Sequence, residues 1–131
     1  MNQRAAGLAL LFGAAISFGA CSSDDAGADP ASPSDGKTVT TKLLAFEPEE
    51  LTVKAGTTVT WTVSDSIGHT VTTGTFELGG DGLRTSENPD GTIDSQLAAG
   101  EDVSYTFTEP GTYTYYCSIH KGMSGVVEVT K

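Results

Sequence analysis

Short runs of β-branched and aromatic residues, separated by turn residues, fill the chain from Lys37 to its end and constrain the fold most strongly. Each run alternates apolar and polar residues over at least part of its length, which is typical of a strand with one buried face. The runs are residues 37–46, 50–54, 57–63, 69–73, 102–108, 112–117 and 125–130. Turn signals separate them at Glu47-Pro48, Ala55-Gly56, Asp65 to Gly68, Ala99-Gly100 and Pro110-Gly111. The pattern predicts an all-β fold, a Greek-key antiparallel β-sandwich of about seven or eight strands.

The alternation also predicts which side chains face the core, because successive strand residues point to opposite faces. Two core rows are expected, Val59, Trp61 and Val63 in one strand and Val103, Tyr105 and Phe107 in another. Tyr113 and Tyr115 have the same parity as Cys117. We therefore expect the Cys117 thiol to lie inside the sandwich, at the end of an aromatic row.

Residues 74–100 interrupt the strand pattern with glycines and acidic residues. We expect a long loop there, with a short strand near Thr92 to Leu97. A loop of this length in a compact domain is usually functional or disordered.

The first 20 residues carry one basic residue, Arg4, followed by an apolar run from Ala5 to Phe18. This run is shorter than the ~20 residues of a membrane-spanning helix, so it predicts a signal peptide over residues 1–20. Gly19-Ala20 precedes Cys21 as in a lipoprotein cleavage site, and we expect Cys21 to carry a lipid that anchors the protein to a membrane. Ordinary cleavage nearby, which leaves Cys21 as a thiol, is the alternative. Either reading predicts export to the periplasmic or cell-surface side.

Residues 22–36 contain Asp, Ser, Pro and Gly but no large apolar residue. Such a segment cannot bury enough surface to offset its ordering entropy, so residues 21–36 are expected to be a lipid-anchored, disordered tether. Residues 37–131 then form the folded domain. The formal net charge of -10 makes nucleic acid an improbable partner, so we expect none.

Cys117, His120 and Met123 fall within one seven-residue window, although the chain has only two residues of each type. A tight turn between two strands would gather them at one end of the sandwich, and His69 is expected at the start of another strand. One thiolate, two imidazoles and a weakly bound thioether are the ligands of a blue-copper electron-transfer site. Taken singly, each residue has a simpler interpretation, as core filler or as a surface histidine. Zinc is the chemical competitor, but a thioether is a poor ligand for zinc.

The residues 46–63, then His69, then the run F-T-E-P-G-T-Y-T-Y-Y-C-S-I-H-K-G-M-S-G-V-V-E-V resemble the plastocyanin and amicyanin branch of the cupredoxins. This resemblance covers nearly all of residues 38–131. It implies that His69, Cys117 and His120 are equatorial copper ligands and that Met123 is the axial one, with one type 1 copper per chain. It also implies that His120 is the electron port. Thr70 stands where the family usually has Asn, and Ile119 where it commonly has Pro.

The resemblance and the ligand set predict a monomeric one-electron carrier that cycles Cu(II) and Cu(I) and docks briefly with redox partner proteins near His120. Catalytic copper proteins need further histidines, and both histidines here are already used, so we expect no enzymatic activity. Copper storage or delivery is the alternative function, although such proteins tend to use exposed and exchangeable ligands.

Overall fold

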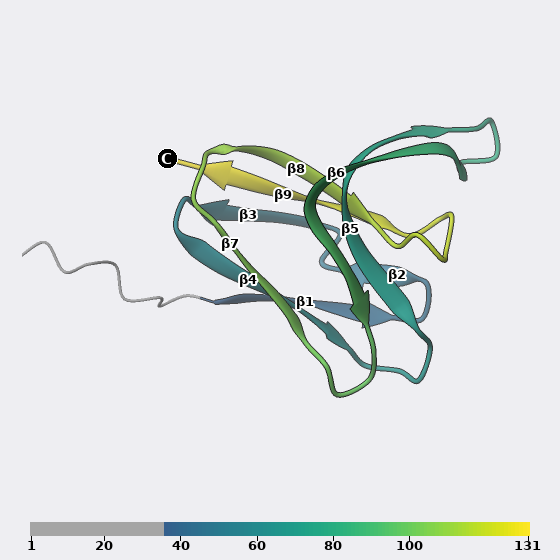
Figure 1. Ribbon diagram of the computed structural model, residues 1–131, viewed down its shortest axis with the longest axis horizontal. Helices are drawn as coiled ribbons and strands as arrows, with labels where there is room; N and C mark the ends of the chain where they lie inside the picture. Colours follow the sequence, from purple (N-terminus) through teal and green to yellow (C-terminus); the bar gives the residue numbers. More distant parts are fainter. Residues whose placement is uncertain (1–35) are drawn as a thin grey trace, which may run out of the picture.

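The computed structural model describes residues 36–131, which form a sandwich of two β-sheets (Figure 1). The predicted signal peptide, Cys21 and most of the predicted tether lie outside the described residues. The nine strands are β1 (Lys37–Lys42), β2 (Ala45–Glu47), β3 (Glu50–Lys54), β4 (Thr57–Val63), β5 (His69–Leu78), β6 (Arg84–Leu97), β7 (Val103–Phe107), β8 (Gly111–Tyr116) and β9 (Ser124–Thr130). Within residues 36–131 no helix is long and apolar enough to cross a membrane.

One sheet has the strand order β2-β1-β4-β7 and the other β3-β9-β8-β5-β6. The all-β sandwich is confirmed, but both sheets are mixed: β1 pairs with β4 in parallel, and so does β3 with β9. The parallel pairs arise because β3 crosses to the second sheet, so that β4 returns alongside β1 in the same direction. The strand count exceeds the expected number because the run 37–46 is broken by a turn at Leu43, whose φ is 54°.

The core lies between the two sheets and contains both predicted rows. Val59, Trp61 and Phe107 are buried, and Val63, Val103 and Tyr105 pack against them as partly buried neighbours. The Trp61 ring meets the Tyr115 ring edge-on, with centroids 5.4 Å apart, a favourable geometry for aromatic pairs. Cys117 is fully buried at the end of this row, as its parity predicted.

The expectation of a long loop over residues 74–100 is wrong, because most of this segment is paired. β5 continues to Leu78 and β6 runs back from Arg84, with the Gly79–Leu83 turn closed by hydrogen bonds between Gly79 and Leu83 and between Gly82 and Gly79. We call residues 74–89 the arm; Figure 1 shows it projecting at the upper right, away from the sandwich. Neither face of the arm is fully buried, so its strands do not require a continuous apolar row. Gly, Asp and Ser therefore interrupt the alternation that would have indicated strands.

An irregularity separates the arm from the base of the hairpin. Thr72 pairs with Asp94, but Gly74 pairs with Pro89, so residues 90–93 bulge out of the ladder. The Asp90 carboxylate accepts hydrogen bonds from Thr73 Oγ1 at 2.6 Å and from the Thr92 backbone N–H at 2.8 Å. The bulge bends the hairpin, as bulges do, and turns the arm toward the connection between β8 and β9.

Candidate metal centre

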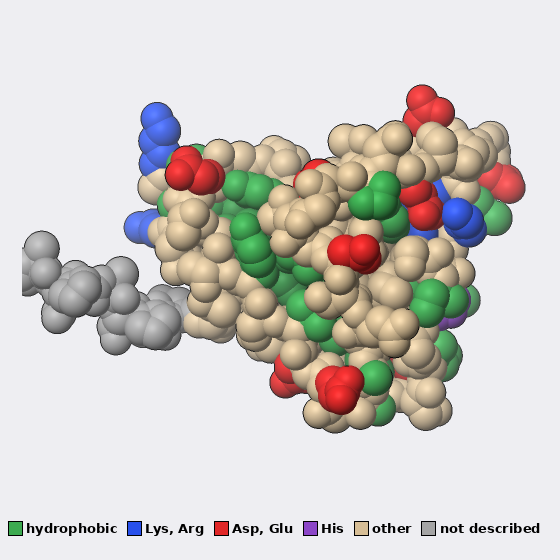
Figure 2. All heavy atoms as spheres, in the orientation of Figure 1, with side chains coloured by type: hydrophobic (Ala, Val, Ile, Leu, Met, Phe, Trp, Pro, Cys, Tyr) green, Lys and Arg blue, Asp and Glu red, His purple; other side chains and the backbone are tan. Residues whose placement is uncertain are grey.

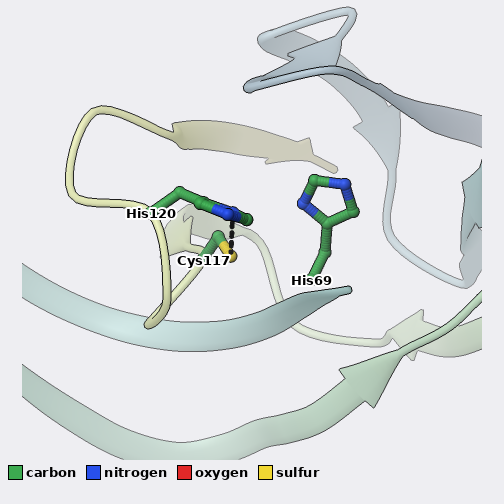
Figure 3. Close-up of side chains that lie close together, drawn as sticks. All are labelled: His69, Cys117 and His120. Carbon is green, nitrogen blue, oxygen red and sulfur yellow. Dashed lines mark hydrogen bonds between the residues drawn. The ribbon is translucent and has the colours of Figure 1, made fainter. Parts of the chain in front are cut away.

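Two neighbouring strands bring the predicted ligands together. β5 and β8 pair through Thr72 with Tyr116, so His69 at the start of β5 lies close to Cys117 just beyond the end of β8. The ligand atoms of His69, Cys117 and His120 all lie within 4.8 Å of one another. Figure 3 shows the thiol and both imidazole rings turned toward one common space. Among the described residues, the structure thus assembles the three predicted equatorial ligands.

Residues 117–123, which we call the ligand loop, connect β8 to β9. The Cys117 N–H donates to the Met123 carbonyl at 3.0 Å, and the Met123 N–H donates to the His120 carbonyl at 3.0 Å. Cys117 Sγ lies 3.4 Å from His120 Nδ1. The loop is therefore a closed turn, and Met123, which is only 1% exposed, points inward at its far end beside the core cluster.

Thr70 connects β5 to the ligand loop. Its backbone N–H donates to Cys117 Sγ at 3.4 Å, and its hydroxyl accepts a hydrogen bond from the Ser118 N–H at 2.7 Å. A backbone donor aimed at the sulfur stabilises a thiolate, which is the form that binds metal. The Thr70 side chain, although shorter than the Asn usual in the resembling family, therefore joins the two ligand-bearing segments.

The polar atoms of His69 fit a metal site. Its side chain is buried, yet its Nδ1 has no hydrogen-bond partner, whereas its Nε2 lies 3.3 Å from the Asp65 carboxylate. A buried nitrogen without a partner is costly unless something binds it. In metal-binding histidines one ring nitrogen usually binds the metal, and the other donates a hydrogen bond to a carboxylate that orients the ring.

Asp65 was expected only as a turn residue, yet it supports His69. Its carboxylate also accepts hydrogen bonds from the backbone N–H groups of Ile67 at 2.8 Å and Leu43 at 2.7 Å. The bond from Ile67 has the largest influence among those that lower the pKa of Asp65 below its ordinary value. The side chain thus stays ionised and orients His69. Its position four residues before a candidate ligand, inside a turn, was the available signal.

Arg84 was also missed. It begins β6, and its guanidinium is buried against the ligand loop. Glu87 receives hydrogen bonds from both Arg84 Nε and Lys121 Nζ, at 3.1 and 2.9 Å. Burial raises the pKa of Glu87, but the bonds from Lys121 and Arg84 outweigh it, so the pKa lies below its ordinary value. An arginine isolated in a Gly-rich, acidic segment was the only sequence signal.

Apolar side chains surround the outer edge of the ligand loop. His120 is half-buried, whereas Ile119 beside it is 57% exposed. Leu83 at the turn of the arm is also exposed and lies next to Gly122. Figure 2 shows a histidine side chain at the right-hand edge with hydrophobic side chains beside it. At this edge the metal-ligand cluster comes closest to solvent, and a small apolar surface surrounds it.

A nine-stranded sandwich with one buried thiol and two imidazoles gathered at its end defines a mononuclear copper protein of the cupredoxin class. The model of the copper binding proteins of the plastocyanin/azurin family matches residues 35–130. The chain belongs to this family. Copper is accordingly its cofactor, and His69, Cys117 and His120 form the candidate ligand cluster.

Several relatives agree with this assignment. The chain is 34% identical over 125 residues to amicyanin-alpha of Methylorubrum extorquens, which covers 92% of this chain and 98% of the relative. It is 37% identical over 87 residues to plastocyanin of Solanum tuberosum, covering 66% of this chain and 87% of that protein. Among solved structures, a mutant amicyanin in its reduced state matches with a TM-score of 0.55 and 33% identity, covering 72% of this chain and 82% of that one. The purple cupredoxin of Nitrosopumilus maritimus matches with a TM-score of 0.51 and 28% identity, covering 72% and 99%.

Proposed function

We propose that this protein is a one-electron carrier whose copper is held by His69, Cys117 and His120, with Met123 as the axial ligand. The observation that carries the proposal is the buried His69 Nδ1, which lacks a hydrogen-bond partner and belongs to a cluster whose ligand atoms lie within 4.8 Å of one another. Copper in such a set exchanges one electron between Cu(II) and Cu(I). The similarity to amicyanin and plastocyanin supports the same conclusion.

The residues around the ligands favour electron exchange over catalysis. His69 and Met123 are buried, and Thr70 and Asp65 hold Cys117 and His69 by hydrogen bonds. A metal site whose ligands are held by hydrogen bonds rearranges little when the charge of the metal changes. Its buried ligands also leave no room for a substrate. We therefore propose no enzymatic role for this chain.

His120 is the proposed electron port, because it is the least buried of the three clustered side chains. Ile119 and Leu83 give its surroundings an apolar surface. A small apolar surface suits brief docking with a redox partner protein. The monomeric state belongs to the same proposal.

We also propose that the domain of residues 37–131 works outside the cytoplasm, held by a lipid on Cys21 and a tether up to residue 36. The apolar run before Gly19-Ala20-Cys21 and the polar composition of residues 22–36 support this. Mass spectrometry of the native protein from a membrane fraction tests it. A Cys21 amino terminus that carries acyl groups is expected; an unmodified amino terminus in the soluble fraction would disprove the anchor.

The function is tested by adding Cu(II) to the purified protein and to its Cys117→Ser variant, and recording visible absorption and electron paramagnetic resonance spectra. We expect an intense blue thiolate-to-copper band and narrow copper hyperfine splitting, both absent in the variant. Reversible one-electron reduction should follow. Colourless copper binding that Cys117→Ser leaves unchanged would instead support storage or delivery, as would rapid loss of copper to a chelator.

A further inference from the structure

Arg84 makes an unusual set of contacts with the ligand loop. Its Nη1 donates to the Met123 carbonyl at 2.7 Å, and its Nη2 donates to the carbonyls of Cys117 and of His120, the latter at 2.9 Å. Its backbone N–H donates to the Lys121 carbonyl at 3.1 Å. One residue of the arm therefore holds four carbonyls of a seven-residue loop, and three of them belong to proposed copper ligands.

The guanidinium is fixed on its other sides as well. Its carbon lies 4.9 Å from the centre of the Tyr116 ring and 5.6 Å from that of Phe76. Nε donates to Glu87, the one carboxylate that pairs with Arg84 among the described residues. Arg84 is only 3% exposed, so its position is set by packing and by hydrogen bonds on every side.

These contacts supply hydrogen-bond donors to carbonyls that lie outside the strand ladders. The carbonyls of Met123 and His120 already accept one backbone hydrogen bond each within the loop, so Arg84 gives them a second donor. It also gives a donor to the carbonyls of Cys117 and Lys121, and buried carbonyls without a donor cost free energy. A metal fixes the side chains of its ligands but supplies no donor to their carbonyls. The planar fork of arginine offers several donors in one fixed geometry, whereas a lysine ammonium could satisfy fewer of these carbonyls at once.

We propose that Arg84 is a positioning residue of the copper site, which holds the ligand loop in its metal-binding shape before the metal enters and keeps a positive charge beside the site. This inference rests on the proposed function, since it takes residues 117–123 as the copper-ligand loop. Two consequences follow. The loop of the metal-free protein owes its rigidity to the arm, and the fixed charge favours Cu(I), the state with less positive charge.

The metal-free protein provides the first test, by amide hydrogen exchange in the wild type, in Arg84→Met and Arg84→Lys, and in the control Lys54→Met. Lys54→Met removes an exposed positive charge at the end of β3, outside the ligand loop, so the loop should exchange as in the wild type. Arg84→Met should speed exchange within residues 117–123 by about tenfold or more, the factor that one lost hydrogen bond to a charged group is worth. Arg84→Lys should restore part of the protection.

Copper-loaded samples give the second test. The reduction potential of Arg84→Met should be lower than that of the wild type and of Lys54→Met, and its copper hyperfine pattern should become heterogeneous. Wild-type exchange in the loop together with an unchanged potential would overturn the proposal. Exchange that rises equally in β3, β4 and the loop would also overturn it, because that result means global destabilisation. If the wild type forms no blue copper site, the proposed function fails, while the exchange data still report whether Arg84 orders the loop.

Discussion

The hydroxyl of Thr70 accepts a hydrogen bond from the backbone N–H of Ser118 at 2.7 Å and lies 3.0 Å from the Ser118 hydroxyl. These contacts link the residue after His69 to the residue after Cys117, across two strands that pair through only a few residues. The spacing between the two ligand-bearing segments thus depends on one small side chain.

Thr70→Val should weaken this link while keeping the shape of the side chain. Thr70 is buried but Ser118 is exposed, so water replaces part of the lost hydrogen bond, and we expect a cost of about 0.5–1.5 kcal/mol in the free energy of unfolding. The copper spectrum of the variant should broaden. Urea unfolding of the metal-free protein measures the first effect. Thr70→Ser keeps the hydroxyl and is the matched control; equal losses in both variants would show that the methyl group, rather than the hydrogen bond, matters.

Met123→Leu should distinguish the effect of the axial ligand from that of the equatorial ligands. Leucine has a similar volume, so we expect a stability loss below about 1.5 kcal/mol. The blue thiolate band should survive because Cys117 remains, and the reduction potential should rise because a sulfur donor that stabilises Cu(II) is gone. Protein-film voltammetry measures the potential. An unchanged potential would mean that Met123 is a core residue and not a ligand.

Asp90→Ala should destabilise the protein, because it removes the hydrogen bonds that hold the bulge at the base of the arm. Burial raises the pKa of Asp90, but hydrogen bonds from Thr73 and Thr92 outweigh it, and the pKa lies below its ordinary value. The stabilisation is therefore complete above about pH 4 and is lost as the pH falls through the lower pKa of the folded state. We expect Asp90→Ala to be about 1 kcal/mol less stable at pH 7, with the difference shrinking below pH 4. Urea unfolding at both pH values tests this; a constant difference would contradict the assignment.

Gly125→Ala should be the most destabilising of these changes. A Cβ at this position would overlap the Tyr115 hydroxyl and lie 2.9 Å from the Glu49 carbonyl. Both are fixed, since Tyr115 is buried and the Glu49 carbonyl accepts a hydrogen bond from Val126. We expect a loss of about 1–3 kcal/mol in the free energy of unfolding. Gly80→Ala is the control, because no atom lies within 4 Å of its added Cβ; similar losses in both variants would refute the steric argument.

Much of the sandwich could be predicted because strand periodicity is a local property. The parity of Trp61, Tyr115 and Cys117 placed all three in the core correctly, and three of the four predicted ligands, those of the His69, Cys117 and His120 cluster, do lie together. Parallel pairing could not be predicted in this way. It depends on which sheet β3 joins, which is a matter of packing between distant segments.

The arm escaped prediction for a different reason. Its strands are largely exposed, so alternation there serves no buried face, and glycine and aspartate indicate loops. The role of Arg84 was hidden as well, because its partners are backbone carbonyls, which any sequence supplies. Hydrogen bonds from side chain to backbone leave no pattern of partner residues to recognise, unlike the Cys, His and Met of the ligand loop.

The proposed ligands are spread unevenly: three lie in one short loop, while His69 comes from the start of β5. A metal bound by both groups acts as a cross-link that closes the long stretch of chain from β5 to β8. Cross-links of this kind restrict the denatured ensemble, and their effect grows with the length of the closed segment. Copper should therefore raise the free energy of unfolding even for regions far from it. A denatured chain that retains its metal would keep both ends of this stretch together and refold faster, because fewer conformations remain to be searched.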